Sequence, residues 1–210
     1  MATFFHIQAS VRGERSYSTR AGRAFLEAYA ESHPDDTLDR LELTREAIPA
    51  FDATAVLAKY RVLQGDSPTD PQKGVWRQVE DVIRRFKAAD KLLISSPMWN
   101  FGIPYTLKQY LDVIVQPGYT FSYSPEEGYR GLVTGRPCML ILARGGAYGP
   151  GTGAEAYDLQ LPYLRMILGF VGYTDVETIL VEPTLQKGKD AAEAALAKAV
   201  ELARTQAGDF

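Results

Sequence analysis

A chain of 210 residues with 46% hydrophobic and 23% charged side chains has the composition of an ordinary globular protein, and we interpret 1–210 as one domain. The 23 basic and 26 acidic residues are spread along the chain and give a net charge of −3, which disfavours nucleic acid as a partner. Two histidines and one cysteine disfavour a metal site, a disulfide and Ser-His-Asp catalysis, and without a signal-like start or long apolar window we expect a cytoplasmic protein with no membrane contact.

Short apolar runs alternate along the chain with longer segments of helical period, as a parallel sheet with crossover helices requires. Strands are predicted at 3–8, 37–43, 91–95, 137–143 and 175–181, the second being the weakest. Helices are predicted after the polar loop 9–18 and at 49–64, 71–89, 104–115, 159–171 and 188–207. This pattern favours an α/β fold of flavodoxin-like type, a doubly wound five-stranded parallel sheet in the order 2-1-3-4-5 with helices on both faces.

The fourth predicted strand carries the single cysteine, Cys138, inside the apolar run 138–142. We interpret it as a small buried hydrophobic residue rather than a reactive thiol. Ligands of such sheets bind beyond the carboxyl ends of the strands. The loops after the first, third and fourth strands are therefore the places to search for a site.

The loop after the first strand is rich in hydroxyl groups and leads directly into a helix. Ser10, Ser16 and Ser18 could donate to phosphate oxygens, and a helix N-terminus adds free amides and a favourable dipole. The alternative is that Ser16 or Ser18 simply caps the helix. Because the loop lacks the glycine pattern of a dinucleotide fold and the Gly-Lys-Ser/Thr of a P-loop, a phosphomonoester is the better fit.

The loop after the third strand, 97–104, is apolar and aromatic and lies between two prolines. Asn100 and Gly102 offer backbone amides to the heteroatoms of a ring. The alternative is a loop buried against the protein or against a second copy. A flat ligand is the more informative interpretation, because three large side chains here are costly to expose without a cover: Met98, Trp99 and Phe101.

The loop after the fourth strand contains the glycine pair Gly145 and Gly146, followed by Tyr148. Paired glycines allow the backbone to approach a planar ligand closely. Most glycine pairs only mark turns, so the pair has little weight by itself. The pair gains weight from its position, because all three loops lie at one edge of the predicted sheet. In chain order they would contact the phosphate, the face of the ring and the edge of the ring.

Four segments resemble the FMN-dependent NADH-azoreductase and quinone reductase family: PMWNFGIPYTLKQYLD, PGYTFSYSPEEGYRGLVTGR, ARGG and PYLRMILGFVGYTDV. The similarity covers nearly the whole chain, and its most specific parts are the loop 98–101 and the stretch 169–176. The resemblance implies FMN as the cofactor, NADH or NADPH as the electron donor, and a homodimer. Two departures are Trp99, where the family often has Tyr, and Ala143, where it often has Ser.

By this resemblance all three loops would hold the cofactor. Beside the resemblance, we expect the amides of Gly145 and Gly146 to stabilise the anionic reduced flavin at its pyrimidine end, and the backbone of Asn100 and Gly102 to contact the flavin edge. The phosphate would lie on Ser10, Ser16, Tyr17 and Ser18. The ring would lie on Pro97, Met98, Trp99, Asn100, Phe101 and Gly102, with Ala143, Arg144, Gly145 and Gly146 at its edge.

The family also implies that the partner subunit helps to wall each active site, which gives a reason for Tyr119, Phe121 and Tyr123. For each of these aromatic residues, packing in the core or the interface is the alternative. We expect Tyr123 and Tyr148 to contact the substrate.

The resulting hypothesis is an FMN-dependent NAD(P)H oxidoreductase that reduces quinones, azo compounds and nitroaromatic compounds by two-electron, ping-pong transfer. One alternative is a flavodoxin-type electron-transfer protein without its own NAD(P)H site. Another is a sensor that has lost the cofactor. Arg12, Arg15 and Arg144 could attract the 2'-phosphate of NADPH or could be ordinary solvated arginines, so the preferred donor stays open.

Overall fold

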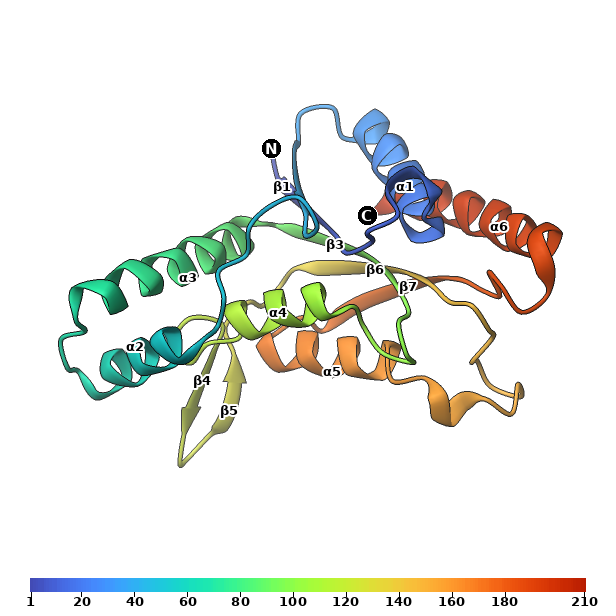
Figure 1. The fold of residues 1–210 in the computed structure, drawn as a ribbon. Coiled ribbons are helices and arrows are strands. Elements are labelled where there is room, and N and C mark those ends of the chain that lie inside the picture. Colours follow the sequence, from blue (N-terminus) through green and yellow to red (C-terminus); the bar gives the residue numbers. More distant parts are fainter.

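The computed structural model describes residues 1–210, and its centre is a five-stranded parallel sheet (Figure 1). The strands are hydrogen-bonded in the order β2-β1-β3-β6-β7. Their bounds are β1 Thr3–Gln8, β2 Thr37–Glu42, β3 Lys91–Pro97, β6 Pro137–Ala143 and β7 Asp175–Val181. Counted among these five strands, the order is 2-1-3-4-5, which confirms the predicted flavodoxin-like fold.

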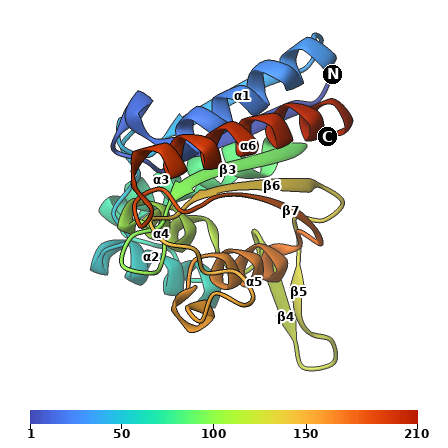
Figure 2. The same cartoon turned by 90° about the vertical axis from the view of Figure 1, so that its right-hand side faces the viewer.

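Six helices cover the two faces of the sheet: α1 Tyr17–Ser32, α2 Ala53–Gln64, α3 Asp70–Ala88, α4 Tyr105–Ile114, α5 Leu161–Val171 and α6 Gly188–Asp209. Figures 1 and 2 show α1 and α6 side by side on one face and α3, α4 and α5 on the other, with α2 beside α3. None of the six is both long and apolar enough to span a lipid bilayer.

Alternating residues of the inner strands feed two separate hydrophobic cores. On β1, Phe5 and Ile7 belong to the core beneath α3, α4 and α5, whereas Phe4 packs with residues of α1 and α6. On β6, Cys138 is fully buried in the first of these cores, and burial raises the pKa of its thiol. Its interpretation as a buried hydrophobic residue is confirmed.

The helix boundaries differ from the predicted ones where local capping decides them. The helix predicted at 49–64 begins only at Ala53, because the Asp52 carboxylate accepts hydrogen bonds from the amides of Thr54 at 2.9 Å and Ala55 at 3.0 Å. At the other end of the chain, α6 continues to Asp209, two residues beyond the predicted end. Such shifts leave the topology unchanged.

A two-stranded hairpin outside the main sheet was not predicted. Its strands are β4 Phe121–Ser124 and β5 Gly128–Gly131, and it projects from the molecule near the end of α5 (Figure 2). A side chain at Gly131 would place its Cβ 2.4 Å from the amide nitrogen of Gly172, so the hairpin base packs directly on that helix end. Strands of four residues carry too little periodicity to be separated from a loop by sequence.

Candidate active site

The three loops selected from the sequence leave the carboxyl ends of β1, β3 and β6, which lie next to one another in the sheet. In Figure 1 these loops gather on the right, and the hairpin lies at the lower left. Two backbone hydrogen bonds join neighbouring strand ends, from the Ala9 amide to the Ser95 carbonyl at 2.9 Å and from the Met98 amide to the Ala143 carbonyl at 2.8 Å. The topology therefore brings the three loops to one edge.

The hydroxyl-rich loop is folded back onto the start of α1. Ser16 caps the helix, since its Oγ accepts from the Thr19 amide at 3.4 Å, and this Oγ lies 3.1 Å from the Ser18 Oγ. Ser10 accepts from the Arg12 amide at 3.3 Å. The capping role of Ser16 is thus confirmed, and it leaves the helix dipole and the first-turn amides directed at the same place.

Side chains around this loop divide into buried hydroxyls and exposed cations. Ser10, Ser16 and Ser18 are buried, Tyr17 is half-buried, and Arg12 and Arg15 are exposed. A short 3-10 turn spans Gly13–Arg15, and Arg12 directly precedes it. The hydroxyls of Ser16 and Ser18 therefore lie together at the start of α1, while the arginines are exposed to solvent.

The loop after β3 makes a tight turn with an unusual backbone. Trp99 and Gly102 exchange two hydrogen bonds, at 3.0 Å and 2.9 Å, and the two residues between them have positive φ angles, 47° for Asn100 and 69° for Phe101. Non-glycine residues with positive φ are uncommon, and a bulky one such as Phe is strained. Strain of this kind is concentrated at functional sites, so the turn is a candidate by geometry as well as by composition.

The same turn corrects one expectation about its amides. The Gly102 amide donates to the Trp99 carbonyl at 2.9 Å and is not free to contact a ring. The amides of Asn100 and Phe101 make no hydrogen bond within the chain. The amide donors that this loop offers are therefore those of Asn100 and Phe101.

The glycine pair after β6 is held by its carbonyl and leaves its amides free. The Gly145 carbonyl accepts from the amides of Leu185 at 3.0 Å and Gln186 at 2.9 Å. The amides of Gly145 and Gly146 make no hydrogen bond within the chain. A Cβ at Gly146 would lie 3.2 Å from the Tyr148 hydroxyl, so a larger residue here requires the Tyr148 side chain to move.

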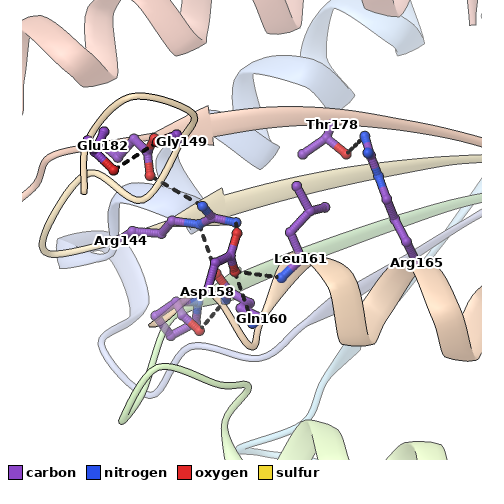
Figure 3. Close-up of polar contacts among 10 residues, drawn as sticks. Arg144, Gly149, Asp158, Gln160, Leu161, Arg165, Thr178 and Glu182 are labelled. Atoms are coloured by element: carbon purple, nitrogen blue, oxygen red, sulfur yellow. Dashed lines mark hydrogen bonds and ion pairs between the residues drawn. The ribbon is translucent and has the colours of Figure 1, made fainter. Parts of the chain in front are cut away.

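The side chain of Arg144 is neither the solvated arginine nor the site for the 2'-phosphate of NADPH that the sequence suggested, and its place at the ring edge stays a prediction. Its side chain is 1% exposed and lies between two carboxylates, Asp158 at 2.9 Å and Glu182 at 3.4 Å (Figure 3). Such a guanidinium is neither a solvated surface group nor accessible to the 2'-phosphate of NADPH. Its burial could not be predicted from the sequence around Arg144, because both carboxylates belong to other loops.

An aromatic cluster joins the loops after β3 and β6. The ring of Phe101, which is 44% exposed, lies 5.1 Å from the ring of Tyr157 and 6.4 Å from that of Tyr148. The Leu159 amide donates to the Phe101 carbonyl at 3.0 Å and fixes the two segments together. Tyr157 was not selected from the sequence, although its place in the glycine-rich segment 149–158 marks a loop near the site.

The opposite side of the turn at Trp99 borders a groove of about 610 Å³. Its lining includes Phe51, Tyr105 and Gln109 as well as Trp99. The Gln109 side-chain amide donates to the carbonyl of Ile48 at 3.0 Å, which holds the segment before α2 against α4. The turn is therefore accessible from the groove on one side and lined by aromatic rings on the other.

The structure does not bring Tyr123 to these loops within one chain. Tyr123 lies on the hairpin with its ring 4.9 Å from that of Tyr129, and Phe121 and Tyr129 both contact Phe170. Tyr119 instead packs toward α3, where its hydroxyl donates to the Glu80 carboxylate at 2.6 Å. Within one chain Tyr123 therefore lies apart from the three loops, on the hairpin.

Comparison with known proteins gives consistent matches over the whole chain. A family profile described as flavodoxin-like fold matches residues 2–207. The FMN-dependent NADH:quinone oxidoreductase of Nitratidesulfovibrio vulgaris (strain DP4) is 50% identical over 210 residues, which is 100% of both proteins. That of Desulfotalea psychrophila is 40% identical over 185 residues, 88% of this chain and 87% of that protein.

Solved structures agree with these relatives. An azoreductase from Bacillus anthracis str. Sterne has a TM-score of 0.92 at 31% identity, covering 100% of both chains. An FMN-dependent NADH-azoreductase from Bacillus anthracis str. Ames Ancestor, in complex with FMN, has a TM-score of 0.87 at 27% identity and covers 99% of this chain and 100% of that one.

Proposed function

The chain belongs to the family of FMN-dependent NADH:quinone oxidoreductases, and on that premise we propose that it binds FMN and uses NADH to reduce quinones and azo compounds. Nitroaromatic compounds are a further acceptor class in this proposal, because they are equally flat and electron-poor. An enzyme that draws on NADH works where NADH is present, so we propose the cytoplasm as its location. The observation that carries the proposal is the meeting of three loops with matched chemistry at one sheet edge.

The serine loop is our proposed site for the FMN phosphate. Its buried hydroxyls on Ser10, Ser16 and Ser18 converge at the N-terminus of α1, with Tyr17 at the first helical position. A phosphate there would receive hydroxyl and amide hydrogen bonds and interact favourably with the helix dipole. No basic side chain is needed for this, which agrees with the outward positions of Arg12 and Arg15.

The turn after β3 and the glycine pair after β6 are our proposed site for the flavin ring, including the flanking residues Pro97, Met98, Trp99 and Ala143. The residues fit a planar heterocycle on two counts. The amides of Asn100, Gly145 and Gly146 have no partner within the chain, and a Cβ at Gly146 would lie 3.2 Å from the Tyr148 hydroxyl. Gly145 and Gly146 are half-buried, where amides without a partner are costly, so a ligand with acceptor atoms would stabilise them.

When bound, FMN supplies the two-electron chemistry, with NADH as donor and the acceptor following in ping-pong order. The contribution of the chain is placement. The amides of Gly145 and Gly146 favour negative charge at the ring edge because they are fixed before the reaction. The rings of Phe101 and Tyr157, inclined at 30°, offer an apolar surface beside the same edge, and Tyr148 stands at 84° to Phe101, which suits the face and border of an aromatic acceptor.

We also propose that the active form is a homodimer. The hairpin presents Tyr123, 63% exposed, and Tyr129, 67% exposed, next to Phe121 and Phe170. An isolated hairpin with exposed aromatic rings gains stability by packing on another surface, and a two-fold dimer is the commonest arrangement. In such a dimer Tyr123 would line the site of the partner. Size-exclusion chromatography with light scattering should give twice the chain mass, and a monomer at all concentrations would contradict this.

The decisive experiment is anaerobic spectroscopy of the purified protein reconstituted with FMN. We expect the flavin absorbance to bleach on addition of NADH and to return on addition of a benzoquinone or an azo dye. NADPH is tested in parallel, because Arg144 is inaccessible and only exposed Arg12 and Arg15 could favour its 2'-phosphate. Bound flavin that neither nucleotide bleaches would favour an electron carrier of flavodoxin type, and failure to bind FMN would refute the proposal.

A further inference from the structure

Arg144 is among the largest fully buried side chains of the molecule and directly precedes the glycine pair. Burying a guanidinium is costly unless ion pairs and hydrogen bonds replace its water. Here the Nη atoms lie 2.9 Å from the Asp158 carboxylate and 3.4 Å from that of Glu182, and Nε donates to the Gln160 side-chain oxygen at 3.3 Å. These three partners surround a guanidinium that is 1% exposed, and its Nη2 has an ion pair with Asp158 but no well-aligned hydrogen bond.

Each partner of Arg144 is itself attached to a different structural element (Figure 3). Asp158 caps α5, because its carboxylate accepts from the amides of Gln160 at 3.1 Å and Leu161 at 3.0 Å. The Gln160 side-chain amide donates to the carbonyl of Pro97, the last residue of β3, at 2.8 Å. The side chain of Arg144 thereby links the N-terminus of α5 and the end of β3 to the end of β6.

The backbone of Arg144 extends the same connection to β7. Its amide donates to the Val181 carbonyl at 3.0 Å, and its carbonyl accepts from the Thr184 amide and hydroxyl, both at 2.8 Å. Glu182, which pairs with the guanidinium, lies between these two residues. The residue before the glycine pair is therefore held on both its backbone and its side chain, and little freedom remains in the direction in which Gly145 leaves the strand.

We propose that Arg144 is a positioning residue, which fixes the Gly145–Gly146 backbone so that its unpaired amides receive the edge of the flavin ring. This inference rests on the proposed FMN site and goes beyond it, because it assigns the orientation of the glycine pair to a buried side chain that touches no ligand. Without the guanidinium, the carboxylates of Asp158 and Glu182, which are only 12% and 15% exposed, would share one place without a cation. Their repulsion would separate α5 from β7 and turn the loop between them.

The matched control is Arg85 on α3, which also binds two carboxylates, Asp39 at 2.7 Å and Glu46 at 2.7 Å. Neither the residue nor its partners belong to the three loops. Arg144→Lys, Arg144→Met and Arg85→Met are compared by fluorescence titration of the apoproteins with FMN, by the flavin midpoint potential and by far-UV circular dichroism. The FMN affinity and the flavin midpoint potential depend on the position of the Gly145 and Gly146 amides. A purely structural effect would change only the thermal unfolding transition measured by circular dichroism.

We expect the FMN dissociation constant to rise at least about 30-fold in Arg144→Met and about 10-fold in Arg144→Lys, which keeps the charge but not the fork of donors. The midpoint potential of the remaining bound flavin should fall in both, because fewer amides stabilise the reduced anion. Arg85→Met should stay within about twofold of wild type. A folded Arg144→Met protein with wild-type affinity and potential would overturn the inference.

If Arg144→Met does not fold, the triple variant Arg144→Met/Asp158→Asn/Glu182→Gln removes the buried carboxylates and takes its place. It should fold and still bind FMN at least about 10-fold more weakly than wild type, and wild-type affinity in it would overturn the inference. The two proposals can fail separately. If wild-type protein does not bind FMN at all, the proposed function and this inference both fall, whereas normal binding in the Arg144 variants removes only the inference.

Discussion

Two arginines in this chain each pair with one aspartate and one glutamate but differ in how deeply they are buried. Arg144 at the end of β6 and Arg85 on α3 each pair with two carboxylates, but the side chain of Arg144 is 1% exposed and that of Arg85 is 33% exposed. Arg85 joins α3 to the edge strand β2 through Asp39 and to the following loop through Glu46. Its hydrogen bond with Asp39 raises the pKa of the Arg85 guanidinium.

The same kind of ion pair contributes differently to stability when its arginine is buried and when it is partly exposed. A half-exposed cluster is screened by water and stabilises the fold only modestly. A fully buried cluster costs desolvation, so it is retained where a particular arrangement of the backbone matters more than stability. In this molecule the buried cluster lies at the carboxyl ends of the central strands, beside the candidate site. The half-exposed cluster lies on β2, the outermost strand of the sheet.

The largest expected difference is in stability. Arg144→Met should lower the free energy of unfolding of the apoprotein by about 3 kcal/mol, because it leaves two carboxylates that are only 12% and 15% exposed without a cation. Arg85→Met should lower it by roughly 1 kcal/mol, since water solvates the carboxylates that remain. Urea denaturation of both variants measures the two losses in the free energy of unfolding. Equal losses would show that burial does not separate the two clusters.

The second prediction concerns the loop that the buried cluster holds. Gly146→Val should raise the FMN dissociation constant about 100-fold, equivalent to about 2.7 kcal/mol. The reason is that its Cβ would lie 3.2 Å from the Tyr148 hydroxyl and occupy the approach of the ring. Gly74→Val is the matched control, because a Cβ at Gly74 on α3 has no atom within 4 Å. Unchanged flavin occupancy in Gly146→Val would remove the glycine pair from the site.

A buried group without a charged partner extends the comparison to pH. His6 on β1 is buried, and its Nε2 lies 2.8 Å from the Ser95 hydroxyl. Burial, assisted by the charge of Arg40, lowers the pKa of His6 to about 3. The folded state thus binds fewer protons than the unfolded state between about pH 3 and 6.5, and the stability present above pH 6.5 is lost as the pH falls.

The expected slope from His6 is about 1.4 kcal/mol per pH unit, so wild-type protein should lose about 2 kcal/mol more than His6→Gln between pH 6.5 and 5. Urea denaturation at both pH values gives the difference, and the carboxylates common to the two proteins cancel. Parallel pH profiles for wild type and variant would contradict a neutral buried histidine.

The smallest effect is expected at the strained turn. Asn100→Gly keeps the positive φ of 47° without a side chain, so FMN affinity should stay within about twofold if only the backbone amide contacts the ring. The same titration measures it, with Asn100→Ala as the variant that also removes the side-chain amide but disfavours the positive φ. A tenfold loss in Asn100→Gly would assign the contact to the Asn100 side chain instead.

The fold was predictable because its signals are local. Alternating apolar residues on β1 and β6 face two cores, and helical spacing marks the connecting segments, so strand order followed from few allowed crossovers. The hairpin was missed because four-residue strands have no readable period. The loops of the site were found from serine, aromatic and glycine residues that stand next to one another in the chain.

By itself, then, the sequence determined the fold, the sheet edge and the residue types in the three loops, because short-range periodicity and turn chemistry encode them. Only the tertiary structure decided that Arg144 is buried, since its partners Gln160 and Glu182 lie 16 and 38 residues away. The tertiary structure also decided which backbone amides are free. In the turn after β3 the Gly102 amide donates to the Trp99 carbonyl, whereas the Asn100 amide has no partner. Such partnerships depend on packing between distant segments, and no local pattern contains them.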